Sequence, residues 1–192
     1  VTPMGVLQRD ALAERFKNIH VDAVYSSDLY RARFTASAIT KYHDLPIIPD
    51  SRFREICLGP WEARYFGNLR REDGEKFRQF IFDQPAFSLP GAETYAQVTE
   101  RAYPALCEIA QKHDGQTIVL TTHGVTIRCL LCKIGGIDLR DNEHLPIFMN
   151  TGVARLFYDQ GRFTIDYAND YSHLSPELQH GMKGPDLRHE FI

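Results

Sequence analysis

The chain has little of what marks a disulfide scaffold or a membrane protein. Its 192 residues include four cysteines, which are too few and too scattered for a framework of disulfides. No apolar run approaches the length that crosses a membrane, and no basic start followed by an apolar middle indicates a signal peptide. We therefore expect a protein of the reducing cytoplasm that has no membrane partner.

The sequence also lacks an excess of positive charge. The 22 Lys and Arg residues are outnumbered by 25 Asp and Glu residues, and the formal net charge of −3 argues against a nucleic-acid partner. Any site for an anion must therefore be local. The sequence also lacks internal repeats and low-complexity segments, and a hydrophobic content of 43% at this length fits one globular domain over residues 1–192.

The spacing of metal ligands is missing as well. Cys129 and Cys132 form a C-x-x-C pair, but they fall inside an apolar helical stretch rather than at an exposed helix start, where a thiolate would be stabilised. No second pair of Cys or His residues stands at the spacing of a zinc site. The pattern favours core packing over redox or zinc chemistry, and we expect neither a metal nor a cofactor.

The most informative stretch is residues 116–128, where the structural period changes at His123 and Gly124. Residues 117–120 are β-branched or aliphatic, as in a buried parallel strand, and apolar residues then recur at helical spacing over residues 125–134. A strand that leads directly into a helix ends at the carboxyl edge of its sheet, where the helix start offers N–H groups to an anion. His123 is then either a phosphate-facing or proton-handling imidazole, or a surface histidine that caps a loop.

An earlier strand, turn and helix has the same polarity. Residues 21–26 predict a strand, and Ser27 and Asp28 indicate the start of a helix with a buried apolar face. Arg31 falls in the first turn of that helix, close to the same edge of the sheet. Its planar, permanently charged guanidinium suits a phosphate, although Arg31 and Arg33 are also explained as part of a solvated face.

Glu55 is the third candidate, because it stands among apolar neighbours in an extended stretch over residues 53–57. A carboxylate in such a place is either an ion-paired structural group or a partly buried acid and base. If Glu55 is structural, Glu93 is the next candidate for a proton donor.

The remaining pattern predicts the fold class. Helices are expected from Thr2-Pro3 to about residue 17, over residues 64–80 as one exposed helix, and over residues 95–112 with a kink or internal start at Pro104. Residues 152–158 and 163–167 predict a hairpin, and residues from about 175 onward predict a tail. We expect an α/β three-layer sandwich with a mostly parallel central sheet, helices on both faces and an antiparallel edge strand.

At this point the sequence resembles the histidine phosphatase superfamily, also called the phosphoglycerate mutase-like family. Residues 27–36 match the S-x-x-x-R-A-x-x-T-A block, and residues 54–62 match the R-E-x-x-x-G-x-W-E segment. Residues 91–94, read as G-A-E-T, are similar to the G-G-E-S turn of the family, and residues 122–124 match its second-histidine motif, T-H-G. The resemblance covers nearly the whole chain in order, with Ala63 and Ala92 where the family has glycine.

The resemblance implies roles for the candidates. Arg31, His123 and Gly124 would bind the phosphoryl group, Glu55 would donate a proton to the leaving group, and the nucleophile would be the histidine of an R-H-G strand. That strand precedes the first helix in the family and is not seen before Val1, so we expect a full-length product heavier than 22.0 kDa that carries it upstream.

The expected activity is hydrolysis of a small phosphorylated metabolite through a phosphohistidine, without a metal. Mutase-type transfer is the alternative, although mutases of the family tend to carry longer insertions between the Glu55 segment and the G-G-E turn than this chain has. A catalytically dead phosphoryl-binding domain is the second alternative if the nucleophile is truly absent. Whether the protein forms a homodimer is left open.

Overall fold

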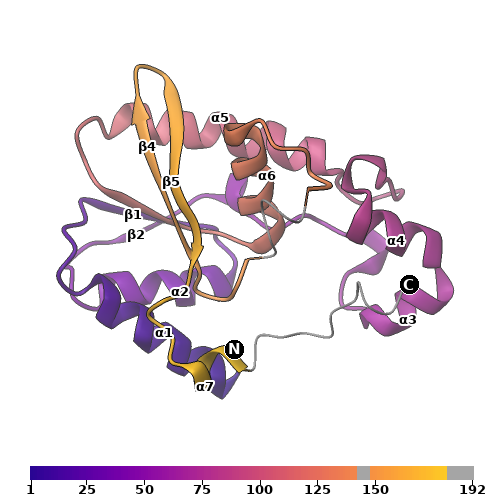
Figure 1. Cartoon of the computed structure of the whole chain (residues 1–192), viewed down its shortest axis with the longest axis horizontal. Coiled ribbons are helices and arrows are strands. Elements are labelled where there is room, and N and C mark those ends of the chain that lie inside the picture. The colour runs from indigo at the N-terminus through magenta and orange to yellow at the C-terminus, as the bar shows by residue number, and fades with distance from the viewer. Residues whose placement is uncertain (142–147, 181–192) are drawn as a thin grey trace.

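The computed structural model describes residues 1–141 and 148–180. Three short strands separated by helices occupy the first two thirds of the chain, and a hairpin follows them (Figure 1). The helices are α1 (Pro3–Phe16), α2 (Tyr30–Thr40), α3 (Phe66–Glu72), α4 (Gly74–Phe82), α5 (Tyr95–Lys112), α6 (Gly124–Gly135) and α7 (Pro176–His180). The strands are β1 (Ala23–Ser26), β2 (Ile47–Pro49), β3 (Ile118–Thr121), β4 (Val153–Asp159) and β5 (Arg162–Asp170).

Three short strands form a parallel sheet in the order β2, β1, β3. The central residue Tyr25 of β1 lies opposite Ile48 on one side and Leu120 on the other. All four residues of β1 are buried, as expected for the central strand of a sheet that is covered on both faces. Because the strands are parallel, the carboxyl ends of β1 and β3 meet at one edge, and the segments that follow them are brought together there.

Helices cover both faces of this sheet. On one face, Leu12 of α1 and Ile39 of α2 pack in one cluster with Val24 of β1. On the other face, Ile109 of α5 and Leu130 of α6 pack in a cluster with Tyr25, whose side chain points away from that of its neighbour Val24. The predicted α/β fold with helices on both faces of a parallel sheet is confirmed.

The predicted hairpin is also present, as β4 paired antiparallel with β5. Its turn places Gln160 and Gly161 at φ values of 46° and 82°, a backbone conformation that suits glycine at the second position. The hairpin packs beside the parallel sheet, since Val153 joins the cluster that contains Val119 of β3. Among the described residues, however, the two strands form their own sheet instead of extending the parallel one.

Two expectations for segments outside the sheet need correction. Residues 64–80 form two helices rather than one, because Asp73 leaves the helical conformation between α3 and α4. The segment is not simply exposed, because Leu69 and Phe77 are fully buried beside Trp61, away from the sheet (Figure 1). Helix α5, in contrast, continues through Pro104 without a second start.

The predicted tail begins with a short helix, α7. The side-chain amide of Gln8 in α1 donates a hydrogen bond to the carbonyl of Leu178 at 2.9 Å, which fixes α7 against the N-terminal helix. The rest of the predicted tail, residues 181–192, lies outside the described residues. None of the helices in the described ranges has the length and hydropathy needed to span a membrane.

Candidate active site

His123 lies where β3 passes into α6, and it is the N-cap residue of that helix. Its side chain is buried, with 7% of its surface exposed. Arg31 donates from Nε to His123 Nδ1 at 3.1 Å, and His123 Nε2 lies 2.8 Å from the hydroxyl of Ser27. Because a guanidinium can only donate, Nδ1 must be the acceptor, so the neutral ring carries its proton on Nε2 and donates it to Ser27.

The environment of His123 favours the neutral ring. The pKa of His123 is lowered from the ordinary value of 6.5 to about 4, mainly by burial and in addition by the positive charge of Arg31. The imidazole is therefore uncharged at neutral pH. The sequence pattern placed Ser27 at a helix start but did not predict its contact with His123. Its position directly after a buried strand was the available signal.

Arg31 is exposed and lies in the first turn of α2. Among the described residues, no carboxylate forms an ion pair with it, and its hydrogen bond goes to the uncharged ring of His123. Arg54 differs, since its guanidinium donates to both carboxylate oxygens of Asp28, from Nε at 2.7 Å and from Nη2 at 2.5 Å. This hydrogen-bonded pair lowers the pKa of Asp28 and ties the Glu55 segment to the start of α2.

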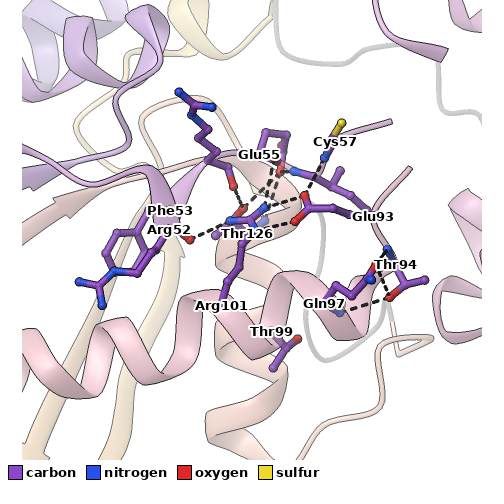
Figure 2. Close-up of polar contacts among 12 residues, drawn as sticks. Arg52, Phe53, Glu55, Cys57, Glu93, Thr94, Gln97, Thr99, Arg101 and Thr126 are labelled. Atoms are coloured by element: carbon purple, nitrogen blue, oxygen red, sulfur yellow. Dashed lines mark hydrogen bonds and ion pairs between the residues drawn. The ribbon is translucent and has the colours of Figure 1, made fainter. Parts of the chain in front are cut away.

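The carboxylate of Glu55 lies at the N-terminus of α6. Its two oxygens accept hydrogen bonds from the backbone N–H groups of Val125 and Thr126, each at 3.3 Å. Figure 2 shows Glu55 beside Thr126. The Thr126 hydroxyl also donates to the carbonyl of Arg54 at 2.7 Å. The end of α6 was predicted to attract an anion, and in the structure a carboxylate of the protein itself occupies the two N–H groups that follow Gly124.

Two of the candidates, Arg31 and Glu55, share one cavity. A space of about 430 Å³ is lined by Leu29, Arg31, Arg54, Glu55, Ile56, Cys57, Leu58 and Glu62. Arg31 and Glu55 both face this space, although they are separated by 24 positions in the sequence. His123 does not line the cavity, but it accepts a hydrogen bond from Arg31, which does. The structure therefore brings all three predicted side chains together at the carboxyl edge of the sheet.

The comparison with known protein families decides the class of site. A family model described as histidine phosphatase superfamily (branch 1) matches residues 1–171. The chain belongs to this superfamily. This superfamily includes mutases and phosphatases, and membership supports a phosphoryl-transfer enzyme of the histidine phosphatase type.

Relatives within the superfamily carry different activities in their names. A protein of Klebsiella pneumoniae named "Probable phosphoglycerate mutase GpmB" is 28% identical over 179 residues, which cover 91% of this chain and 83% of the relative. Among solved structures, YhfR of Bacillus stearothermophilus superposes with a TM-score of 0.86 at 29% identity, covering 90% of this chain and 86% of YhfR.

A mycobacterial glucosyl-3-phosphoglycerate phosphatase, solved with inorganic phosphate, superposes with a TM-score of 0.79 at 23% identity. The match covers 91% of this chain and 89% of the phosphatase chain. This likeness shows the shared histidine phosphatase fold.

Proposed function

We propose that the protein hydrolyses phosphomonoesters of a small metabolite through a phosphohistidine intermediate. The proposal depends most on the charge of Arg31, which forms no ion pair with a carboxylate within residues 1–141 and 148–180 and faces the same cavity as the carboxylate of Glu55. A guanidinium whose described partner is a neutral imidazole can pair with a phosphoryl dianion without first losing an ion pair. A carboxyl group in the same cavity can exchange a proton with the ester oxygen.

In this proposal Arg31, His123 and Gly124 bind the phosphoryl oxygens. Arg31 supplies the positive charge. The Nε2–H group of neutral His123 donates its hydrogen bond to a phosphoryl oxygen instead of to the Ser27 hydroxyl. An anion bound beside His123 would raise the pKa of the ring from its low value in the free site, so the ring gains a proton more readily when the substrate is bound. Oriented donors of this kind stabilise the charge that develops during phosphoryl transfer.

Glu55 acts twice in the proposed reaction. The nucleophilic histidine attacks phosphorus and the P–O bond to the leaving group breaks, while protonated Glu55 gives its proton to the leaving oxygen. The Glu55 carboxylate then takes a proton from water, and the water oxygen attacks phosphorus and releases the histidine and inorganic phosphate. General acid and base catalysis by a positioned group contributes about 10² to 10⁴ in rate.

For the nucleophile we propose the histidine of an R-H-G strand encoded upstream of Val1. The arrangement of the two sheets supports this proposal. Within the described ranges, β3 pairs only with β1, and the β4–β5 hairpin packs beside it without backbone hydrogen bonds to it. A further parallel strand between β3 and the hairpin would pair with the open edge of β3 and place its carboxyl end beside His123.

Hydrolysis is favoured over mutase-type transfer because the segment between Glu62 and Gly91 is shorter than the insertions that mutases of the family tend to carry there. It folds into two helices and a short 3-10 turn, Gln84–Ala86, around a cluster of aromatic side chains. The mutase alternative is kept because the relative named above is called a phosphoglycerate mutase. The apolar side chains of Leu29, Ile56 and Leu58 in the cavity fit a leaving group that is partly apolar.

A panel of phosphomonoesters assayed with the full-length protein in the presence of a chelator tests the proposal. We expect release of inorganic phosphate from at least one small ester and no need for added metal. Transfer of the phosphoryl group to a second hydroxyl of the substrate without release of phosphate would support the mutase. Binding of phosphate without turnover of any ester would support the catalytically dead domain.

A further inference from the structure

The segment that carries Glu55 has no regular secondary structure, so something other than a helix or strand must hold it. Arg101 of α5 lies beneath this segment, and its side chain is 22% exposed. Its guanidinium donates from Nη1 to the carbonyl of Arg52 at 2.7 Å and from Nη2 to the carbonyl of Glu55 at 3.2 Å (Figure 2). One side chain therefore holds the backbone before Glu55 and the backbone of Glu55 itself.

The same guanidinium forms an ion pair with Glu93. Nε donates to one carboxylate oxygen at 2.7 Å, and Nη2 donates to the other at 3.0 Å. Glu93 in turn holds the chain on the far side of Glu55. Its carboxylate accepts the N–H of Cys57 at 2.8 Å, and its own N–H donates to the carbonyl of Cys57 at 2.7 Å.

Both members of the ion pair are held by helix α5. Glu93 directly precedes Thr94, which is the N-cap of α5, and the capping box between Thr94 and Gln97 satisfies donors at the start of the helix. Arg101 follows two turns later on the same helix. The pair is thus attached to one rigid element that also packs against the central sheet.

Glu93 is poorly suited to donate protons itself. Burial raises its pKa, but the hydrogen bonds from Arg101 and from the Cys57 N–H outweigh burial, so the pKa of Glu93 is lowered. The carboxylate stays ionised at neutral pH. The expectation that Glu93 is the next candidate for a proton donor is therefore not supported by its surroundings.

We infer that Arg101 and Glu93 are positioning residues that hold the backbone on both sides of Glu55 and so aim its carboxylate at the ester oxygen. The inference rests on the proposed function, since it gives Glu55 the role of proton donor. A displacement of about 1 Å in a catalytic group can reduce the rate about 10²-fold, so a loosened segment is expected to affect proton donation before it affects folding.

The experiment compares two esters in single-turnover phosphorylation of the full-length protein. An alkyl phosphate needs a proton on its leaving oxygen, and an activated aryl phosphate does not. The ratio of the two rates therefore reports proton donation, whereas a general loss of structure lowers both rates together. Glu55→Gln sets the ratio expected when the donor is removed.

The test variants are Arg101→Lys and Glu93→Gln. Lysine keeps the charge at position 101 but cannot reach two carbonyls and two carboxylate oxygens at once. Glutamine at position 93 is close in shape to glutamate, so Glu93→Gln is the second variant if Arg101→Lys does not fold. The control is Glu108→Gln, which removes an ion pair of 2.6 Å between α5 and Arg52 that does not contact Glu55. Urea midpoints are recorded for every variant.

We expect Arg101→Lys and Glu93→Gln to slow the alkyl ester at least about 10-fold more than the aryl ester, with Glu108→Gln keeping the wild-type ratio. If Glu55→Gln changes the ratio and neither positioning variant does, the inference is overturned while the proposed function stands. If Glu55→Gln slows both esters equally, Glu55 is not the proton donor, and the proposed function and the inference fail together.

Discussion

At the scale of single residues, the site combines one permanent charge with one neutral ring. Arg31 supplies the positive charge, whereas His123 is neutral because burial and the charge of Arg31 lower its pKa to about 4. Their hydrogen bond orients the ring through Nδ1 and leaves the Nε2 proton for Ser27 or for a phosphoryl oxygen. The shape of the guanidinium therefore matters as well as its charge.

Replacing Arg31 with lysine tests this requirement. Lysine keeps the charge but loses the planar fork and the bond from Nε to His123. We expect the full-length Arg31→Lys protein to lose about 10² to 10³ in kcat/KM, with a urea midpoint close to that of the wild type, because the side chain is exposed. Arg33→Lys, at an exposed position on the same helix, is the control and is expected to change neither quantity. Nearly normal hydrolysis by Arg31→Lys would assign Arg31 to the solvated surface.

At the scale of elements, the N-terminus of α6 organises the site. It carries His123 as its N-cap, and the N–H groups of Val125 and Thr126 hold the carboxylate of Glu55. In the proposed reaction, His123, which donates a hydrogen bond to the phosphoryl group, and Glu55, which donates the proton, therefore depend on the same helix end. The role of the Gly124 N–H in binding phosphate remains a prediction.

Two substitutions at Gly124 separate this N–H from the space around it. Within the part of the chain that the structure describes, a Cβ there would meet only Glu55 Oε2, at 3.9 Å, so Gly124→Ala should fold and bind phosphate as the wild type does. Gly124→Pro removes the N–H at the first helical position, where proline is tolerated, and the extended conformation of His123 is compatible with a following proline. We expect inorganic phosphate to inhibit Gly124→Pro about 10-fold more weakly than Gly124→Ala. Equal inhibition of the two variants would show that the Gly124 N–H does not contact phosphate.

The elements could be predicted where the sequence repeats at a clear period. The strands that precede Ser27 and His123, the helices that follow them and the β4–β5 hairpin all came from such patterns, and the sheet edge then brought Arg31 and His123 together. The support of Glu55 could not be predicted. It depends on Arg101 reaching carbonyl groups 46 and 49 positions earlier in the chain, and no local pattern encodes that contact.

The burial of the segment that forms α3 and α4 was missed for a related reason. The segment is rich in charges of both signs, which predicts an exposed helix. Its phenylalanines instead pack with Trp61 in a cluster assembled from several elements. Burial of this kind follows from tertiary contacts, which the local composition does not report.

At the scale of the whole molecule, the network around Arg15 links α1 to the end of the hairpin. Arg15 donates to Asp170 at 2.7 Å and to His173 Nδ1 at 3.2 Å. Burial, with the charge of Arg15 added to it, lowers the pKa of His173 to about 4. The folded protein therefore resists protonation of His173 more than the unfolded chain does.

This difference predicts how stability depends on pH. Between the ordinary pKa of 6.5 and the lowered value of about 4, the unfolded chain binds more protons, so stability falls as the pH is lowered through this window. His173→Gln keeps an acceptor for Arg15 but does not titrate. Between about pH 7.5 and about pH 5, we expect the variant to lose roughly 1 kcal/mol less stability than the wild type, after allowance for partial exposure. Urea unfolding at both pH values measures this, and equal losses would contradict the assigned shift.

The central claim is that Glu55 first gives a proton to the leaving group and then takes one from water. An activated aryl phosphate bypasses the first role, so full-length Glu55→Gln should still be phosphorylated by it but should hydrolyse the phosphoenzyme slowly. Rapid-quench kinetics combined with intact mass measurement is the most direct test. We expect a burst of about one phenol per protein molecule and an accumulated phosphohistidine that is stable in alkali and lost in acid. Steady release of phenol without a burst, and with no phosphorylated protein in the variant or the wild type, would contradict the central claim.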